Sequence, residues 1–252
     1  MKIGIVGLGL IGGSIFKSLK DKYDVIGISS SVQEEGVFKD YNKLKDCNLI
    51  FVCTPMSATL DILEKLDSIL PSTAIVSDVS SLKGFVSKKK YSYRFIPSHP
   101  MAGTENSGWE SSFSGLFQDA KWIITPIDGE ILAEQEDLEE VIESMGAKII
   151  ITTPEEHDKA VALVSHMPMI IAQALCENIK DNKLAQELAS SGFRDTTRLA
   201  LSNLQMANDM AQMNKENIAQ ALNSLNICLQ SIIGNDYREK AQEIKIFRQN
   251  LY

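Results

Sequence analysis

Cysteine is scarce in this chain, and the few residues present are widely spaced. Cys47, Cys53, Cys176 and Cys228 form no C-x-x-C pair and have no histidine at the spacing of zinc ligands. This pattern excludes a disulfide scaffold and gives no indication of a metal site. We therefore expect free thiols, no bound metal and a reducing, cytoplasmic compartment.

Basic residues are outnumbered by acidic ones. The 252 residues include 25 Lys and Arg against 33 Asp and Glu, which gives a net charge of −8. Proteins that bind nucleic acids normally present a basic face. The one basic cluster, at 88–90, is only three lysines long and is typical of a solvated turn. Nucleic acid is therefore not an expected partner.

Long apolar runs are also missing. The uncharged stretch 3–16 is interrupted by five glycines and runs into Lys17, whereas a secretory signal has a continuous apolar segment followed by a cleavage site. No other segment approaches the roughly 18 apolar residues of a membrane helix. The sequence predicts neither a signal peptide nor a membrane partner.

The first 153 residues contain short β-branched runs that alternate with helical patterns. Strands that are apolar along their whole length, separated by helices, are typical of a parallel sheet covered on both faces. The predicted strands are 2–6, 25–28, 49–53, 74–78, 94–96, 122–125 and 148–152, and the predicted helices are 11–20, 57–69 and 131–145. The fold class is therefore α/β, with a doubly wound, mainly parallel sheet.

The remaining residues, 154–252, have an all-helical pattern. Thr153 is expected to cap the first helix, with Pro154 at the first helical position and Glu156 three residues after the cap. Apolar residues then recur at helical spacing, and their faces are wide for about a hundred residues. We expect part of this surface to form a homodimer contact, although packing within the monomer is the alternative.

The motif G-L-G-L-I-G at 7–12 lies between the first predicted strand and the first predicted helix. Gly7 allows a tight turn, Gly9 lets the backbone approach a pyrophosphate, and Gly12 lets helix and strand pack closely. Leu10 and Ile11 open the helix, whose free N–H groups attract phosphate. The motif predicts a dinucleotide site, and a purely structural turn is the alternative.

The second predicted strand ends in three serines at 29–31, where relatives of this fold often carry a charged residue. A carboxylate at this point favours NAD, and a basic residue favours NADP. Because the sequence shows no Lys or Arg alongside, we expect NAD, bound near Ser29 and Ser30, and leave NADP open.

Two further strands also end in polar or small residues. Cys53, Thr54 and Pro55 follow the third strand, and Asp78 ends the fourth. Ligands of open α/β sheets bind beyond the carboxyl ends of the strands, so we expect these residues at the cofactor site. Ser81 either binds a ligand hydroxyl or caps the next helix.

Histidine is rare, and each of the three has an expected place. His99 follows another predicted strand at the same edge, where a group with a pKa near 6.5 can deprotonate an alcohol as hydride leaves. His157 and His166, nine residues apart on one predicted helix, are half a turn apart in projection. They are therefore expected to share no metal and to be structural or supporting residues.

Five motifs occur in order along both halves of the chain: G-L-G-L-I-G-G-S at 7–14, D-V-S-S-L-K at 78–83, H-P-M-A-G-T-E at 99–105, S-H-M-P at 165–168 and F-R-D-T-T-R at 193–198. Together they resemble the prephenate and arogenate dehydrogenase family of tyrosine biosynthesis. The resemblance implies a Rossmann domain (1–153) and a helical dimerisation and substrate domain (154–252). It also implies oxidative decarboxylation of prephenate to 4-hydroxyphenylpyruvate, with hydride transfer to NAD⁺.

The same resemblance implies roles for individual residues. His99 would accept the proton of the substrate 4-hydroxyl, and Ser81 would orient that hydroxyl. Arg198 would bind a substrate carboxylate as a bidentate fork. Arg194 either adds positive charge for the substrate or forms an ordinary surface ion pair. Further substrate contacts are expected at Thr104 and Ser165.

Two departures from the family pattern leave the substrate open. Many relatives have a second histidine where this chain has Met169, and many have a Pro and a Trp in the region corresponding to 202–207. Both positions fall where prephenate and arogenate differ, so an arogenate or dual-specificity dehydrogenase is the alternative. A non-catalytic dinucleotide-binding regulator is a remote alternative. A β-hydroxyacid dehydrogenase would need a catalytic lysine on the helical domain, and His99 would not be its base.

Overall fold

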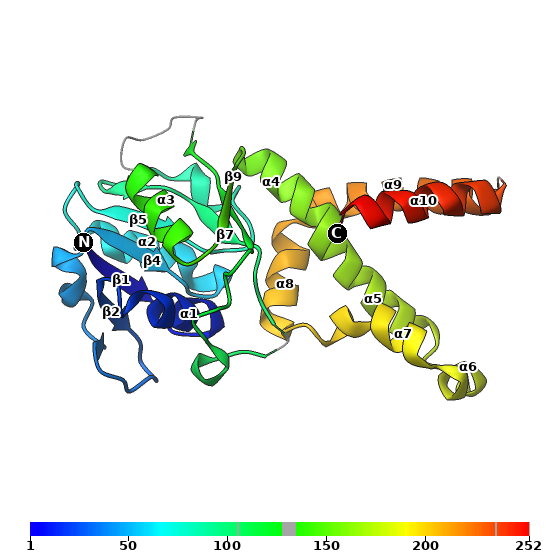
Figure 1. Cartoon of the computed structure of the whole chain (residues 1–252), viewed down its shortest axis with the longest axis horizontal. Coiled ribbons are helices and arrows are strands. Elements are labelled where there is room, and N and C mark those ends of the chain that lie inside the picture. The colour runs from blue at the N-terminus through cyan, green and yellow to red at the C-terminus, as the bar shows by residue number, and fades with distance from the viewer. Residues whose placement is uncertain (105, 128–134, 235, 252) are drawn as a thin grey trace.

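The chain is divided into an α/β part and a helical part (Figure 1). A computed structural model describes residues 1–104, 106–127, 135–234 and 236–251. A six-stranded sheet has the order β3-β2-β1-β4-β5-β6, with every neighbouring pair parallel. Its strands are β1 (Lys2–Val6), β2 (Asp24–Ile28), β3 (Val37–Phe38), β4 (Leu49–Val52), β5 (Ile75–Asp78) and β6 (Arg94–Phe95). The predicted fold class is confirmed.

Helices cover both faces of this sheet, which explains why its strands are apolar along their length. α1 (Leu10–Leu19) and α3 (Gln135–Ser144) pack with Ile3 and Ile5 on one face. α2 (Met56–Asp67) packs with Ile50 and Val52 on the other. The predicted helix 131–145 matches α3, although 131–134 lie outside the described residues. The strand order reverses between β1 and β4, which is where open α/β sheets bind ligands.

A second, three-stranded sheet lies beside the first. Its strands are β7 (Ser98–Pro100), β8 (Lys121–Ile124) and β9 (Lys148–Ile151), with β7 antiparallel and β9 parallel to β8. The predicted strands 122–125 and 148–152, which correspond to β8 and β9, were expected in the large parallel sheet, and this expectation is wrong. The short strands β3 and β7 were not predicted, because two or three residues carry no periodic pattern. His99 therefore lies within β7, opposite Ile123, and not in a loop.

The helical part begins as predicted, since the Thr153 hydroxyl accepts a hydrogen bond from the Glu156 N–H at 3.2 Å. α4 and α5 are joined by a π-helical turn, Ala162–His166, into one long helix. α5, α6 and α7 lie along one arm and α9 and α10 along another, whereas α8 lies between the arms and the α/β part (Figure 1). The bounds are α4 (Pro154–Val161), α5 (Met167–Asn178), α6 (Lys183–Leu188), α7 (Ser191–Thr196), η6 (Arg198–Leu201), α8 (Leu204–Met213), α9 (Lys215–Gly234) and α10 (Tyr237–Leu251).

The helix Pro154–Asn178 is long and apolar enough, by length and composition, to cross a membrane. The expectation that no segment meets this criterion is therefore wrong. The same helix carries two buried histidines, His157 and His166, and contributes Val161 and Met169 to an apolar cluster with Met56 of α2. Together with Ala207 and Met210 of α8, which belong to the same cluster, this helix packs the helical part against the α/β part.

Candidate active site

The glycine-rich turn has the geometry that the motif predicts. Gly7 has φ +89°, a conformation that side-chain-bearing residues rarely adopt. A Cβ at Gly12 would lie 2.0 Å from the Gly7 carbonyl oxygen, so only glycine lets α1 pack this closely on β1. A Cβ at Gly9 would meet nothing within 4 Å. The turn is therefore open at Gly9, where a phosphate can approach the free N–H groups that begin α1.

A cavity of about 410 Å³ opens in front of this turn. It lies at the carboxyl ends of β1, β2 and β4, where the strand order reverses. Five of the predicted cofactor residues line it: Gly7, Gly9, Ser29, Ser30 and Thr54. Leu8, Ser31, Lys39, Tyr41, Gly108 and Trp109 also line it and were not among the predicted contacts. The size, glycine backbone and helix terminus fit the adenosine and phosphates of a dinucleotide.

Lys39 corrects one expectation about this cavity. The sequence shows no cation next to the end of β2, but the structure places Lys39 in the cavity wall. The reason is the pairing of β3 with β2, in which the Ser29 N–H donates to the Phe38 carbonyl at 2.9 Å. Only this pairing brings Lys39 beside the serines, and a strand of two residues gives no signal in the sequence.

The other predicted cofactor residues are not part of the cavity wall. These are Leu10, Ile11, Gly12, Cys53, Pro55 and Asp78. Cys53 packs against Gly12, and burial raises the pKa of its thiol far above the usual range. Asp78 is fully buried, and its carboxylate accepts a hydrogen bond from Lys83 Nζ at 2.6 Å. We propose that Asp78 supports the strand end and does not contact the cofactor through its carboxylate.

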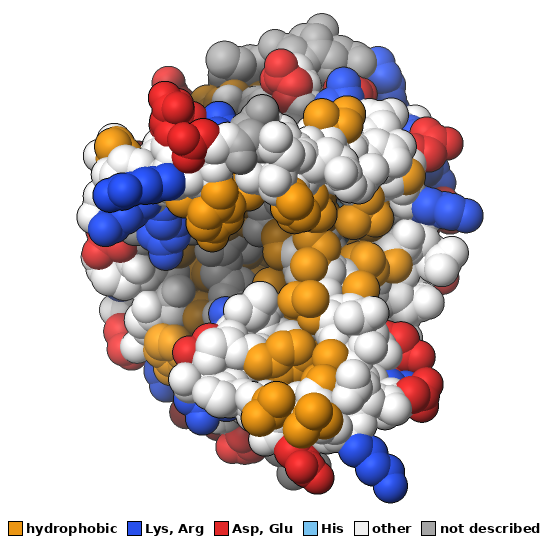
Figure 2. Space-filling model, turned by 90° about the vertical axis from the view of Figure 1, so that its right-hand side faces the viewer, with side chains coloured by type: hydrophobic (Ala, Val, Ile, Leu, Met, Phe, Trp, Pro, Cys, Tyr) orange, Lys and Arg blue, Asp and Glu red, His pale blue; other side chains and the backbone are white. Residues whose placement is uncertain are grey.

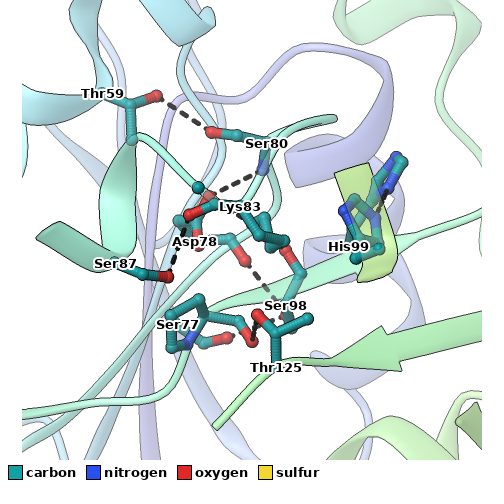
Figure 3. A network of polar contacts seen from close by, with 12 residues as sticks. Thr59, Ser77, Asp78, Ser80, Lys83, Ser87, Ser98, His99 and Thr125 are labelled. Atoms are coloured by element: carbon teal, nitrogen blue, oxygen red, sulfur yellow. Dashed lines mark hydrogen bonds and ion pairs between the residues drawn. The ribbon is translucent and has the colours of Figure 1, made fainter. Parts of the chain in front are cut away.

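A buried polar network fixes β7 beyond the carboxyl end of β5 (Figure 3). The Ser98 hydroxyl donates to the Asp78 carbonyl at 3.0 Å and accepts from Trp122 Nε1 at 2.9 Å. The Lys83 ammonium donates to the Asp78 carboxylate and to the Ser98 carbonyl. Burial lowers the pKa of Lys83, and Asp78 opposes that shift. Because Ser98 is held in this way, its neighbour His99 has a defined position at the same sheet edge as the cavity.

His99 is the first member of a chain of three polar side chains that crosses between the two parts. His99 Nδ1 lies 2.9 Å from His157 Nε2, and His157 Nδ1 lies 2.8 Å from Asp158 Oδ1. The Asp158 carboxylate also accepts the backbone N–H groups of Lys83 and Gly84, each at 2.8 Å. His157 and Asp158 come from α4, whereas the other three residues come from the α/β part.

This chain of contacts determines which nitrogen of His99 carries the proton. Asp158 accepts bonds at both carboxylate oxygens, so His157 Nδ1 is the donor between them. In neutral His157, Nε2 is then an acceptor, and His99 Nδ1 must donate to it. The remaining nitrogen of His99, Nε2, keeps its lone pair and has no hydrogen-bond partner among the described residues. His99 is thus prepared to accept a proton at Nε2.

The charge state of His99 agrees with this role. Burial lowers the pKa of His99 well below 6.5, and the nearby His157 and Lys83 lower it further. At neutral pH the ring is therefore uncharged and can act as a base. The His157 contact was missed in the sequence, because the two histidines are 58 residues apart and belong to different parts of the chain.

His166 also lies on this side of the long helix, contrary to expectation. Asn214 Nδ2 donates to the Asp158 carbonyl at 2.9 Å and lies 3.1 Å from His166 Nδ1, which is therefore an acceptor. The half-turn separation of His157 and His166 assumes a regular helix. The π-helical turn between them changes the phase and brings both rings into the buried interior.

The buried His166 predicts a loss of stability in acid. Burial lowers its pKa from 6.5 to about 4. Between these values the unfolded chain binds a proton that the folded chain does not, so the free energy of unfolding falls as pH falls through this window. The shift corresponds to about 3 kcal/mol. Urea unfolding at pH 7 and 4.5 should show a smaller acid loss for His166→Asn, which keeps an acceptor. Equal losses in both proteins would contradict this prediction.

The predicted substrate residues lie on several elements. Ser81 follows Ser80, whose N–H donates to the Asp78 carboxylate at 3.0 Å, and within the described residues the Ser81 hydroxyl has no hydrogen-bond partner. Ser165 is half-buried in the π-helical turn. Arg198 begins η6 and is exposed. The roles of Ser81, Ser165 and Arg198 toward a substrate therefore all stay predictions.

Thr104 and Arg194 are engaged locally. Thr104 is exposed and exchanges hydrogen bonds with the backbone of Asn106. Arg194 is 79% exposed and pairs with Asp195 at 3.5 Å, a geometry that contributes little to stability. Glu105, the last residue of its motif, lies outside the described residues. None of these contacts reaches His99 within the part of the chain that the structure describes.

A base that takes the proton of an alcohol is useful beside a nucleotide cofactor, because the same alcohol carbon can then lose hydride. The fold and this edge of the sheet therefore define a class, the nucleotide-dependent dehydrogenases with a helical second domain. Residues 25–151 match the family model "Prephenate dehydrogenase, nucleotide-binding domain", and 153–244 match "Prephenate dehydrogenase, dimerization domain". The chain belongs to the prephenate dehydrogenase family.

Relatives along the whole chain agree with this assignment. A prephenate dehydrogenase of Lactococcus lactis subsp. cremoris is 29% identical over 98% of this chain and 74% of its own. The crystal structure of Synechocystis arogenate dehydrogenase is 34% identical, with TM-score 0.82 over 99% of this chain and 97% of that one. The Aquifex aeolicus prephenate dehydrogenase, solved with hydroxyphenyl propionate and NAD⁺, is 28% identical, with TM-score 0.87 over 100% and 98%.

Proposed function

We propose that the chain oxidises and decarboxylates prephenate to 4-hydroxyphenylpyruvate, with NAD⁺ as hydride acceptor. The observation that carries this proposal is the uncharged His99, with its Nε2 lone pair free, at the same sheet edge as the nucleotide cavity. Family membership supports the substrate, and a relative solved with NAD⁺ supports the cofactor. The cavity and the open turn at Gly9 fit that cofactor.

The chain's residues divide the work of the reaction. The open turn at Gly9 and the cavity beside it would hold NAD⁺, which would supply the hydride acceptor for the ring carbon that carries the hydroxyl. His99 Nε2 takes the hydroxyl proton, and the bond from His99 Nδ1 to His157 stabilises the ring that has gained that proton. Ser81 orients the hydroxyl. Carbon dioxide leaves the opposite ring carbon, and aromatisation of the ring makes the step favourable. His157 and Asp158 act as positioning residues, since neither touches substrate.

Initial rates of dinucleotide reduction test the proposal directly. Prephenate and arogenate are each offered with NAD⁺ and with NADP⁺, and we expect prephenate to be oxidised with the higher kcat/KM. A higher value for arogenate would favour the second candidate. That candidate rests on the 34% identity to an arogenate dehydrogenase and on Met169, which is buried in the cluster between the two parts. No reduction with either substrate would contradict the proposed function.

Arg198 predicts a defect in substrate binding. The side chain is exposed and long enough to turn toward an anion, and a guanidinium binds carboxylate through two charge-assisted hydrogen bonds. Such bonds contribute about 1.5–3 kcal/mol, so Arg198→Ala is expected to raise the KM for prephenate about tenfold or more. Arg194→Ala is the matched comparison. An unchanged KM in Arg198→Ala would place the carboxylate elsewhere.

We also propose that the chain forms a homodimer through its helical part. Apolar side chains gather along both rims of a groove between the two helical arms (Figure 2). The exposed apolar residues of this part include Leu184, Leu188, Leu201, Leu204, Ile227, Leu229, Ile233, Ile244, Ile246 and Phe247. Exposed apolar surface of this extent favours association, and the family's name for the domain supports a dimer. Sedimentation should give a particle of two chains, and a single chain would contradict the proposal.

We propose a reducing, cytoplasmic location. All four cysteines are free, and Cys176 and Cys228 are exposed. Exposed free thiols are compatible with a compartment that keeps cysteine reduced. Fractionation of cells that express the protein from its own gene, followed by immunodetection, tests this location.

A further inference from the structure

Thr59 of α2 lies between two loops at the carboxyl edge of the large sheet. The loop after β4 contains Thr54, which lines the nucleotide cavity, and the loop after β5 contains Ser80, which precedes Ser81. Thr59 is fully buried, and its Oγ1 lies 3.3 Å from the hydroxyl oxygens of both Thr54 and Ser80. Figure 3 shows the contact with Ser80. One hydroxyl thus joins the loop of the cofactor cavity to the loop of the expected substrate contact.

The backbone around Thr59 fixes the direction of these hydrogen bonds. Thr59 Oγ1 lies 3.0 Å from the Pro55 carbonyl oxygen and 3.4 Å from the Thr54 carbonyl oxygen. A carbonyl oxygen can only accept, so the single proton of Thr59 is donated to the backbone of the preceding turn. The two lone pairs of Thr59 Oγ1 then accept the protons of the Thr54 and Ser80 hydroxyls. Thr59 is therefore the shared acceptor of both loops.

Ser80 is held at two points. Its N–H donates to the Asp78 carboxylate at 3.0 Å, and its hydroxyl donates to Thr59. Ser80 is 5% exposed, and within the described residues its hydroxyl has no other hydrogen-bond partner. Because a buried hydroxyl without a partner is costly, the contact with Thr59 favours the observed arrangement of this loop. The position of the next residue, Ser81, follows from that arrangement.

We propose that Thr59 is a positioning residue that holds the loop of Ser80 and Ser81 against the loop of Thr54, so that cofactor and substrate stabilise the same arrangement. The assignment of Ser81 to the substrate comes from the proposed function, on which this role of Thr59 rests. Thr59 touches neither ligand, since it is fully buried and is not part of the described cavity wall. A ligand that stabilises one loop stabilises the other through the shared hydroxyl, and the coupling is reciprocal.

Two variants separate the hydroxyl of Thr59 from its packing. Thr59→Val keeps the shape of the side chain but removes the shared acceptor, whereas Thr59→Ser keeps the acceptor and removes only a methyl group. The Kd of NAD⁺ is measured by calorimetry on the intact chain, and amide hydrogen exchange of residues 79–82 is measured with and without NAD⁺.

In the unmodified protein and in Thr59→Ser, NAD⁺ is expected to slow exchange at 79–82 about tenfold, the size of a typical coupling between sites. In Thr59→Val this slowing should fall below about twofold, and NAD⁺ should bind about fivefold more weakly. The kcat/KM for prephenate should fall about tenfold in Thr59→Val and stay within about twofold in Thr59→Ser.

Thr125→Val is the matched control. Thr125 is also fully buried, and its hydroxyl contacts the Pro97 carbonyl at 3.4 Å, with no printed contact to either loop among the described residues. The same substitution there is expected to lower the melting temperature and to leave NAD⁺ binding, exchange at 79–82 and kcat/KM unchanged. Ser80→Ala breaks the contact with Thr59 from the other loop, so it should reproduce the loss of coupling and replaces Thr59→Val if that variant does not fold.

Three results would overturn this role of Thr59: no slowing of exchange by NAD⁺ in the unmodified protein, equal slowing in Thr59→Val and Thr59→Ser, or the same loss of coupling in Thr125→Val. Exchange and Kd are read without turnover. A protein that oxidises neither prephenate nor arogenate but loses the coupling only in Thr59→Val would refute the proposed function and retain the link between the loops. A protein that oxidises prephenate but shows equal slowing in both Thr59 variants would do the reverse.

Discussion

His99→Asn is expected to lower kcat for prephenate by about 10²- to 10⁴-fold, the usual contribution of a general base. Asparagine can donate from Nδ2 to His157 Nε2, in place of His99 Nδ1, so the buried chain to Asp158 is kept. What is lost is the basic nitrogen that faces the substrate. Steady-state kinetics measure the loss, and the Kd of NAD⁺ should stay the same.

The pH dependence of the unmodified protein gives a second readout for His99. The base must be uncharged, so kcat/KM falls as pH drops through the pKa of His99. Since burial holds that pKa well below 6.5, the acid limb is expected below 6.5. Turnover of His99→Asn within tenfold of the unmodified protein, at equal thermal stability, would remove His99 from the mechanism.

His157→Phe is expected to lower kcat by about 10²-fold, although the residue does not touch substrate. Phenylalanine keeps a ring of similar shape in a position that is 2% exposed, but it removes the acceptor for His99 Nδ1. His99 can then carry its proton on Nε2, and loss of tautomer control in a catalytic histidine is costly. NAD⁺ binding should be unaffected.

His157→Gln is the matched control. Its amide oxygen can replace Nε2 as the acceptor, so it should recover most of the turnover lost in His157→Phe. Equal losses in the two variants, in proportion to their melting temperatures, would show that His157 has only a structural role.

The sequence predicted well those features that depend on neighbours along the chain. The glycine turn, the cap at Thr153 and the buried strands β1, β2, β4 and β5 each have a local pattern, and the structure shows them where they were expected. The sheet edge was predictable for the same reason, because each parallel strand ends in a recognisable place. The same reasoning placed His99 at this sheet edge, although the strand β7 that contains it was not predicted.

The features that were missed depend on contacts between distant segments. Lys39 reaches the cavity through a strand of two residues, and His157 reaches His99 across 58 positions. The π-helical turn also has no signature in the sequence, yet it changes the direction in which His166 points. Local periodicity predicts elements, whereas these three features are set by how the elements meet.

The hydrogen bonds from the backbone N–H groups of Lys83 and Gly84 to the Asp158 carboxylate restrict motion of the helical part relative to the α/β part. In an enzyme with two domains, a hinge motion can separate the domains so that ligands exchange. Here, hinging at this point would break two backbone contacts to a carboxylate and would also detach His157 from His99. The two parts therefore have to stay in contact at Asp158 for His99 to keep its acceptor.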